Sequence, residues 1–399
     1  MMRSLYAGVT GMQSQQMLMD VIGSNIANVS TVGYKSARVC FADLLNQTIR
    51  GASATTNPMQ IGTGVRVGAV NTLYHQGSMQ ASENELDLGI VGKGFIVLQD
   101  GDNRLYTRAA SLSFDAEGYL VHTATGLRVL GWRAQADGTI NIGTPLAALR
   151  AGQGEQMPPT ASTGITFDGS FDARLADGEK LFREVTVIDG AGRGHSLVME
   201  FTRISATQWN WNLTAQDGTA IGNGAITFDG DGKVTAGGQA TVVVAMDDRT
   251  NDLPLNLDFS TILQVGGDSS VAGYQIGGMK AGNLYDVSID EKGILYGIYD
   301  NGVTRALGQV ALAIFANQEG LERKGNNLFA ATMASGEADT KAAAGVGRGL
   351  FSPRSLEMSN VDLSREFVSM IISQRAFQAN SRVVTTTDEL LQEVVNLVR

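Results

Sequence analysis

The spacing of apolar residues at the start of the chain predicts an amphipathic helix that requires a partner. Between Arg3 and Asn28, apolar side chains recur in alternating steps of three and four residues, which is the spacing of a coiled-coil seam. Three glycines in this segment each weaken an isolated helix by roughly 0.5–1 kcal/mol relative to alanine. We therefore expect the helix to be stable only when packed. The predicted seam consists of Leu5, Val9, Met12, Met19 and Ile26, with Ile22 beside it.

The end of the chain predicts a longer helix with the same spacing. Residues 361–399 contain no Gly or Pro, and at 1.5 Å per residue they would extend for about 58 Å. Ser359 and Asp362 have the spacing of a capping box, which places the start of the helix there. Polar residues interrupt the seam at three positions, and such residues favour packing against several neighbours or a wall that faces water. The predicted seam consists of Phe367, Met370, Phe377, Val384, Leu391, Val395 and Val398.

Between the two helical segments the pattern changes to a period of two residues, which is typical of β-strands. Segments 284–289 and 294–298 alternate on either side of an Asp-Glu-Lys-Gly turn, and segments 185–188 and 197–201 flank the Asp189-Gly190 turn. Such turns account for much of the glycine content, 49 of 399 residues, because glycine supplies the positive φ that they require. We predict a multidomain, mainly β body inserted between paired N- and C-terminal α-helices that form a coiled coil.

Changes in composition predict where the domains begin and end. Glycine- and proline-rich stretches at residues 152–159 and 266–282 bracket a separate β domain, and the Ala/Gly tract from Ala342 to Gly349 connects the β body to the last helix. The predicted organisation is a helical inner domain of residues 1–30 with 360–399, a connecting segment of residues 31–70, a discontinuous β domain of residues 71–150 with 283–359, and an outer β domain of residues 151–282.

Charge and cysteine content narrow the classes of function. The formal net charge is −10, with 40 acidic and 30 basic residues, which argues against nucleic acid as a partner because phosphate binding requires clustered Lys and Arg. The single cysteine, Cys40, excludes an intramolecular disulfide and a thiolate metal cluster. No apolar run reaches the roughly 18 residues that span a bilayer, and the first residues do not resemble a usual signal peptide. We expect no membrane insertion.

No segment carries a convincing pattern for chemistry, so we predict no enzyme activity, no cofactor and no metal site. Residues 229–233 resemble the start of a calcium loop, but Lys233 stands where an oxygen ligand belongs, which favours a hairpin turn. The three histidines have no metal-binding spacing. Trp209 and Trp211 share one face of a predicted strand, where core packing is favoured over stacking on a sugar. A secreted glycan-binding β protein is the remote alternative.

Three blocks of sequence resemble the bacterial flagellar basal-body rod and hook family. The first runs from Asn25 to Lys35, the second from Gly92 to Val121, and the third from Leu356 to Ser381. In the second block, Lys93 and Ala110 stand where this family often has Asn and Gly. The resemblance implies paired terminal helices that line an inner tube, with β domains stacked outward. The signature residues are Asn25, Asn28, Thr31, Gly33, Tyr34, Asn360, Asp362, Gln374, Arg375, Phe377 and Asn380.

Within this family, the chain length and the additional β domain resemble the hook branch more than the shorter rod proteins; a distal rod subunit is the alternative. The resemblance implies a structural subunit of an extracellular, curved helical tube that transmits torque as a universal joint. It also implies export without cleavage of a signal peptide. The implied partners are further copies of the chain, the rod, hook-cap, hook–filament junction and hook-length-control proteins, and the flagellar export apparatus. We expect the helix seam to be the self-assembly surface.

Overall fold

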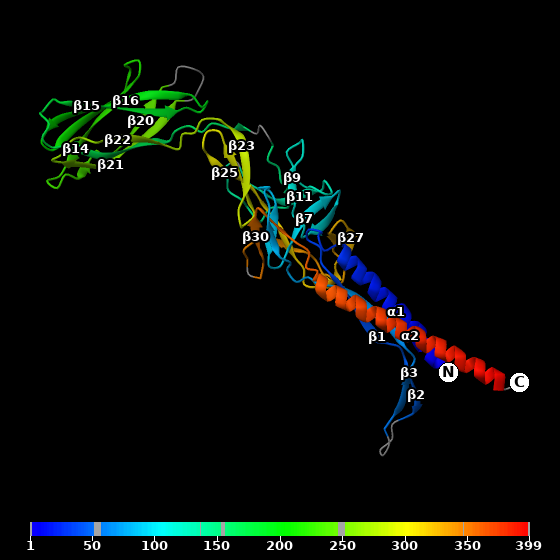
Figure 1. Cartoon of the computed structure of the whole chain (residues 1–399). Helices are drawn as coiled ribbons and strands as arrows, with labels where there is room; N and C mark the ends of the chain where they lie inside the picture. Colours follow the sequence, from blue (N-terminus) through cyan, green and yellow to red (C-terminus); the bar gives the residue numbers. More distant parts are fainter. Residues whose placement is uncertain are drawn as a thin grey trace. The chain divides into compact units, whose positions relative to one another are not determined.

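The computed structural model describes residues 2–51, 57–135, 137–152, 156–245, 252–345 and 347–397. The chain divides into two compact units (Figure 1). The helix-bearing unit comprises Met1–Gly152, Val287–Gly297 and Arg305–Arg399, and the sandwich unit comprises Gln153–Asp286 and Ile298–Thr304. An N-terminal helix, a large β body and a C-terminal helix confirm the predicted fold class. The finer division into four domains stays a prediction.

Two long helices, α1 (Met2–Ala27) and α2 (Leu363–Leu397), lie side by side in opposite directions in the helix-bearing unit (Figure 1). The predicted capping box is wrong, because Asp362 is itself the N-cap of α2. One carboxylate oxygen of Asp362 accepts the backbone N–H groups of Ser364 at 3.0 Å and Arg365 at 3.3 Å. A carboxylate at this position satisfies two first-turn donors at once and also suits the positive end of the helix dipole.

Among the described residues, no helix is long and apolar enough to cross a membrane.

The β body of the helix-bearing unit is built on a sheet with the strand order β25-β11-β7-β8-β28-β27. Its core contains aromatic residues, with Tyr106 edge-on to Phe315 at 4.7 Å between ring centroids. The strands of this sheet and its branches are β7 (Phe95–Asp100), β8 (Asn103–Thr107), β9 (Leu112–Phe114), β10 (Leu120–His122), β11 (Arg128–Arg133), β12 (Ala147–Ala148), β25 (Thr304–Val310), β26 (Leu312–Ile314), β27 (Glu322–Gly325), β28 (Leu328–Ala330) and β29 (Asp339–Lys341).

Four two-stranded ribbons complete this unit, and two of them lead from the β body to α2. A short 3-10 helix, η1 (Gln318–Gly320), precedes β27. The ribbons pair β1 (Ala37–Asp43) with β4 (Val65–Thr72), β2 (Asn46–Arg50) with β3 (Met59–Gly62), β5 (Met79–Ala81) with β31 (Ser355–Glu357), and β6 (Leu88–Val91) with β30 (Leu350–Pro353). Two further strands, β23 (Gly282–Ile289) and β24 (Ile294–Tyr299), have residues in both units.

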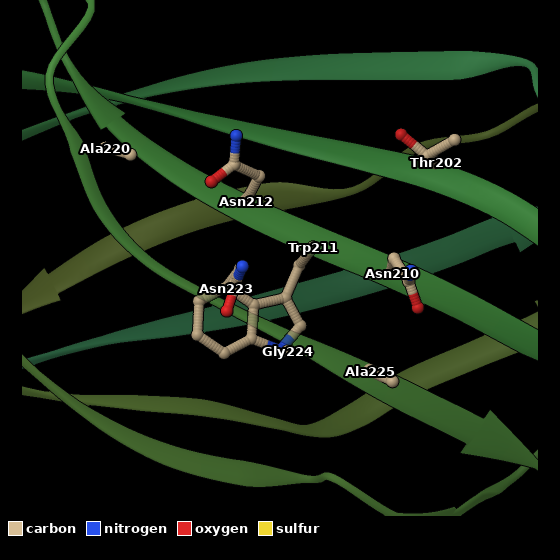
Figure 2. Close-up of a pocket in the computed structure, with 8 residues that line it drawn as sticks. All are labelled: Thr202, Asn210, Trp211, Asn212, Ala220, Asn223, Gly224 and Ala225. Atoms are coloured by element: carbon tan, nitrogen blue, oxygen red, sulfur yellow. The ribbon is translucent and has the colours of Figure 1, made fainter.

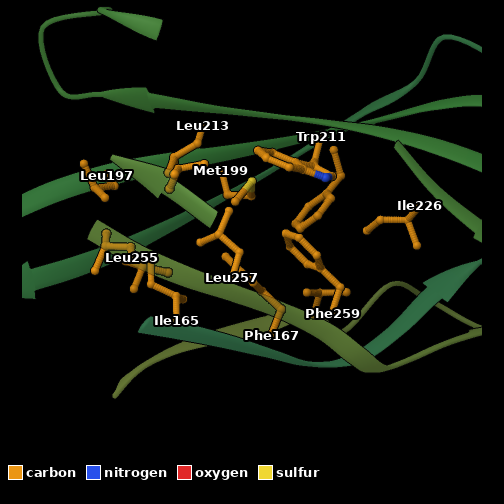
Figure 3. Close-up of a cluster of buried hydrophobic side chains, with 14 of the residues drawn as sticks. Ile165, Phe167, Leu197, Met199, Trp211, Leu213, Ile226, Leu255, Leu257 and Phe259 are labelled. Carbon is orange, nitrogen blue, oxygen red and sulfur yellow. The ribbon is translucent and has the colours of Figure 1, made fainter. Parts of the chain in front are cut away.

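The sandwich unit packs two sheets around one apolar core (Figure 3). Its sheets have the orders β15-β16-β17-β18-β19 and β20-β21-β14-β22, and β14 is parallel to β21. Period-two alternation turns Trp209, Trp211 and Leu213 of β17 inward, which confirms core packing for both tryptophans. The strands of these two sheets are β14 (Gly164–Asp172), β15 (Lys180–Ile188), β16 (Gly194–Ser205), β17 (Gln208–Ala215), β18 (Ala220–Phe228), β19 (Val234–Ala236), β20 (Gln239–Val244), β21 (Leu253–Val265) and β22 (Ala272–Ile276). The short strand β13 (Gln156–Met157) pairs with β23 instead.

Several hairpins are closed by an Asp-x-x-Gly turn. In the segment that resembles a calcium loop, Asp229 Oδ1 accepts the N–H groups of Asp231 at 3.0 Å and Lys233 at 2.8 Å. The carboxylate therefore holds the turn together through the backbone. This confirms the predicted hairpin turn at residues 229–233. One detail differs from the sequence prediction: at the Asp189-Gly190 turn it is Gly192, the fourth residue, that has the positive φ of 82°. The turns of this kind begin at Asp115, Asp189, Asp229 and Asp290.

Candidate assembly surface on the terminal helices

Small and polar residues form the contact between α1 and α2. Ser373 is fully buried there, and its hydroxyl donates a hydrogen bond of 3.1 Å to the backbone oxygen of Gln15. A Cβ atom added to Gly11 would lie 2.7 Å from Nδ2 of Asn380. The two backbones therefore approach closely because glycine and serine leave room, and close packing then supplies dispersion contacts along the pair.

The glycine at position 11 permits a direct test of this contact. We expect Gly11→Ala to weaken the pairing of α1 with α2, because the added methyl group meets the Asn380 carboxamide. The matched control is Gly23→Ala, since a Cβ at Gly23 has no neighbour within 4 Å and the change removes about 1 kcal/mol of helix-propensity cost. Amide hydrogen exchange in α1 is the measurement. Equal protection in the two variants would contradict a tight contact at Gly11.

The most deeply buried positions between the helices lie beside the predicted seam, and the seam residue Val384 takes part in the contact by facing Gly8 of α1. The buried positions on α2 include Ser373 and Thr387, which directly precede Gln374 and Asp388, two of the three polar positions that interrupt that seam. Small residues occupy the closest part of this contact because they let the two helix backbones approach. The bulkier seam residues flank it. On α1 the buried residues are Gly8, Gly11, Ser14, Ile22 and Asn25. Of the predicted seam, Leu5, Val9, Met12, Met19, Ile26, Met370, Phe377, Val384 and Leu391 are half-buried, Phe367 and Val395 are exposed, and Val398 lies outside the described residues.

The first turns of α2 leave a row of large apolar side chains uncovered. These residues, which we call the apolar face of α2, are separated by one and four positions and so adjoin one another on the helix surface. Each is more than half exposed within the chain. Contiguous apolar surface of this kind marks a site of protein–protein interaction. The apolar face of α2 consists of Phe367 (51% exposed), Val368 (57%), Ile371 (51%) and Ile372 (62%).

The signature residue Asn25 fastens α1 to both α2 and the β1–β4 ribbon. Its carboxamide is 1% exposed and forms a reciprocal pair with the backbone of Ala37, accepting from the N–H and donating to the carbonyl at 2.9 Å each. Its Nδ2 also donates to Glu366 of α2 at 3.2 Å, and the Tyr34 hydroxyl donates to its Oδ1 at 3.4 Å. One side chain thus joins three segments. A buried carboxamide of this kind is costly unless all its hydrogen bonds are made.

The signature residue Asn360 does the same at the start of α2. Its Oδ1 accepts the N–H of Ser36 at 2.8 Å, and its Nδ2 donates to the carbonyls of Leu73 at 2.8 Å and His75 at 3.0 Å. The chain therefore enters α2 from a position fixed against the residue before β1 and the segment after β4. Among the other signature residues, Gly33 is buried with a φ of 69°, the Thr31 hydroxyl donates to Asn28 at 3.1 Å, Asn380 and Phe377 are half-buried, and Gln374 and Arg375 are exposed.

Beneath this junction lies a buried ion cluster that the sequence prediction missed. Glu357 of β31 contacts Lys35 Nζ at 2.6 Å and Arg108 Nε at 2.8 Å, and the three side chains are 0–3% exposed. The N–H of Gly77 donates to the same carboxylate at 2.9 Å. The guanidinium donates further to the carbonyls of Ile90, Gly92 and Gly94, and Lys35 donates to His75. The cluster therefore connects the segment after α1, the β body and the segment before α2.

The charges in this cluster influence one another strongly. Burial alone raises the pKa of the Glu357 carboxyl, but the charges of Arg108 and Lys35 lower that pKa overall. Burial and the charge of Arg108 lower the pKa of the Lys35 ammonium group. One signal in the sequence points to the cluster: each of the three family-like blocks contains one of these charged residues.

The sandwich unit has a shallow cavity of about 590 Å³ over β17 and β18 (Figure 2). Trp211 lies at its floor but is only 3% exposed, and a Cβ on Gly224 would stand 2.7 Å from the indole ring. Trp209 is fully buried and stacks on Phe171 at 4.3 Å between centroids. These two residues therefore do not form the open aromatic platform for a sugar that the glycan-binding alternative requires.

The described residues contain no group of three or more His, Cys, Asp or Glu that could hold a metal ion.

Family models match four separate parts of the chain. The model described as "Flagella basal body rod protein" matches residues 5–35, and "Flagellar hook protein FlgE/F/G D1 domain" matches residues 89–170. The model described as "Flagellar basal body protein FlaE D2 domain" matches residues 170–279, and "Flagellar basal body rod FlgEFG protein C-terminal" matches residues 352–397. The matched parts include both helices, the β body and the sandwich unit.

Whole-length relatives agree with these matches. The chain is 35% identical over 440 residues to the flagellar hook protein FlgE of Borreliella burgdorferi, with both chains fully covered. It is 30% identical over 406 residues to the flagellar basal-body rod protein FlgG of Bacillus subtilis, again with full coverage of both. The crystal structure of Helicobacter pylori flagellar hook protein FlgE2 shares the fold, with a TM-score of 0.53 and 15% identity, covering 70% of this chain and 100% of that chain.

Proposed function

This chain belongs to the family of bacterial flagellar hook proteins, and from that premise we propose that it is a structural subunit of the hook. Copies of the chain polymerise into a curved helical tube that transmits torque from the rod to the filament. The tube is extracellular, and the subunit reaches it through the flagellar export apparatus without cleavage of a signal peptide. Its further partners are the rod, hook-cap, hook–filament junction and hook-length-control proteins. It performs no catalysis.

The observation that supports polymerisation is the uncovered apolar face of α2. Burying this face against a neighbouring copy would stabilise the polymer by about 25 cal/mol for every Å² of apolar area removed from water. The face is on the side of α2 away from the Ser373 contact, so a neighbouring copy can cover it while α1 stays in place. A contact between two different surfaces gives a helical polymer when successive copies do not close into a ring.

A charge on the apolar face of α2 should block polymerisation. We expect Ile372→Glu to raise the critical concentration for tube formation at least about tenfold, because a carboxylate buried in an apolar contact loses its hydration. The unfolding temperature of the monomer should not change, since Ile372 is 62% exposed. The matched control is Ile142→Glu, at an isoleucine that is 56% exposed in the β body. Sedimentation and electron microscopy measure the result, and tubes at the wild-type concentration would contradict the proposed surface.

The curvature of the polymer distinguishes the hook from the rod. A distal rod subunit would build a straight, stiff polymer. This is the alternative function, because the chain is also similar to a flagellar rod protein. Purified wild-type protein should form curved tubes in electron micrographs, and uniformly straight tubes would favour the rod alternative.

A further inference from the structure

The side of α2 that faces away from α1 carries one line of charged side chains, which we call the charged line of α2. It consists of Arg375, Arg382, Glu389 and Glu393, separated by seven, seven and four residues. At 3.6 residues per turn, this spacing places all four within about 40° of one another around the helix axis, roughly half a turn from the Ser373 contact with α1. All four side chains are exposed. The charged line therefore continues the apolar face of α2 along the same side of the helix.

The signs of these charges are segregated along the helix, with both cations before both anions. On a helix surface that only faces water, opposite charges typically alternate at spacings of three or four residues and pair within the helix. Here no acidic residue stands three or four positions from either arginine, and Glu389 and Glu393 are four residues apart, where like charges repel. Among the residues that the structure describes, none of the four side chains forms an ion pair. The charged line is thus left without a partner by its own chain.

A segregated line of this kind is complementary to a second copy of itself that is shifted along the axis. Two parallel α2 helices in register would place like charges opposite each other. A shift brings Arg375 opposite Glu389, which is 14 residues further on, and Arg382 opposite Glu393, which is 11 residues further on. One shift of 12 to 13 residues serves both pairs and corresponds to about 19 Å at 1.5 Å per residue.

We propose that the charged line is a contact between the α2 helices of neighbouring copies, which lie parallel with an axial shift of about 19 Å. This proposal rests on the proposed function and deepens it, because it names the partner surface and its register. Each copy offers its arginines to one neighbour and its glutamates to another, so the contact joins two different surfaces and repeats from copy to copy. The same shift sets Ile371 of the apolar face level with Val383 of the next copy, which is 41% exposed.

Charge reversals in the full chain test this contact. We expect Arg382→Glu alone and Glu393→Arg alone each to raise the critical concentration for tube formation about tenfold, because each places like charges opposite each other. The double variant Arg382→Glu/Glu393→Arg should return to within about threefold of the wild-type value, since it only exchanges the two signs. The effect of each single reversal should shrink between about 0.1 M and about 1 M NaCl, where the Debye length falls from about 10 Å to about 3 Å.

The matched control is Asp388→Arg. Asp388 is an exposed acid next to Glu389 in sequence but lies about 100° away around the helix, so its reversal makes the same change in net charge outside the charged line. It should alter the critical concentration by less than about threefold. Circular dichroism of the monomers should show the same helix content in every variant, because all these side chains are exposed.

Sedimentation and electron microscopy measure the assembly of all variants. The inference is overturned if the single reversals assemble like wild type, if the double variant is not restored, or if Asp388→Arg loses as much as they do. Closed dimers would also overturn it, because they are the product of antiparallel pairing of the same charges. Wild-type protein that forms no tubes contradicts the proposed function and this contact together. Wild-type tubes with unaffected reversals contradict only the charged line.

Discussion

Replacing Glu357 by Gln is expected to destabilise the helix-bearing unit by about 3–5 kcal/mol. The substitution keeps the shape of the side chain but leaves the Lys35 and Arg108 cations buried without a counter-charge, at 0% and 3% exposure. Removing one member of a buried ion cluster costs far more than the cluster contributes when complete, because the remaining charges cannot regain their hydration. The effect is large also because both carboxylate oxygens accept hydrogen bonds, one from Arg108 and the other from Lys35 and Gly77, so the amide NH2 of Gln must face a donor.

The matched control for Glu357→Gln breaks an ion pair in water. Glu117 contacts Arg128 at 3.0 Å, but its side chain is 68% exposed, so Glu117→Gln should change the stability by less than about 1 kcal/mol. Denaturant titration followed by amide hydrogen exchange measures both variants and distinguishes the helix-bearing unit from the sandwich unit. If the two variants lost equally little stability, the buried cluster would have no special role.

The pH dependence provides a second check on Glu357. Its pKa in the folded chain is lowered. Its contribution to stability is therefore complete above the ordinary carboxyl pKa of about 4.3 and is lost as the pH falls through the folded-state value. The difference in stability between wild type and Glu357→Gln should accordingly shrink in acid. A difference that stayed constant down to low pH would show that Glu357 does not act through its charge.

Local patterns were sufficient to predict the architecture. A step of three and four residues at both ends and a period of two between them distinguish helix from strand because each reflects the geometry of one segment alone. The Asp229 turn and the inward-facing Trp209 and Trp211 followed from the same local reasoning. Three blocks of family-like sequence then indicated how the ends are combined with the middle.

The contacts between distant segments were not predictable in this way. A face shifted by one residue has the same three-four spacing as the apolar seam, so periodicity cannot choose between Ser373 and Gln374 as the residue that meets α1. The choice depends on how closely Gly11 lets the helices approach, which is a property of both chain segments. Lys35, Arg108 and Glu357 are separated by 73 and 249 residues, and only the folded ribbons bring them together.

Removing α2 is expected to abolish polymerisation altogether. A chain that ends at Asn360 should form no tubes at any accessible concentration, because it lacks the apolar face of α2 and the partner of α1. Its β structure should stay folded, since Glu357 and the hydrogen bonds of Asn360 to Ser36 and Leu73 are retained. We expect α1 to lose its amide protection, because helices that lack tertiary packing are marginal in water.

This truncation separates folding from assembly. Far-UV circular dichroism should show the loss of helix with the β signal retained, hydrogen exchange should leave the sandwich unit as protected as in the full chain, and sedimentation should find monomers only. The aromatic core around Phe171 and Trp209 supplies an internal standard, because it belongs to a different unit from the helices. Tubes formed by the truncated chain would mean that the terminal helices do not drive polymerisation. Loss of the sandwich signal would mean that α2 is needed for folding as well as for assembly.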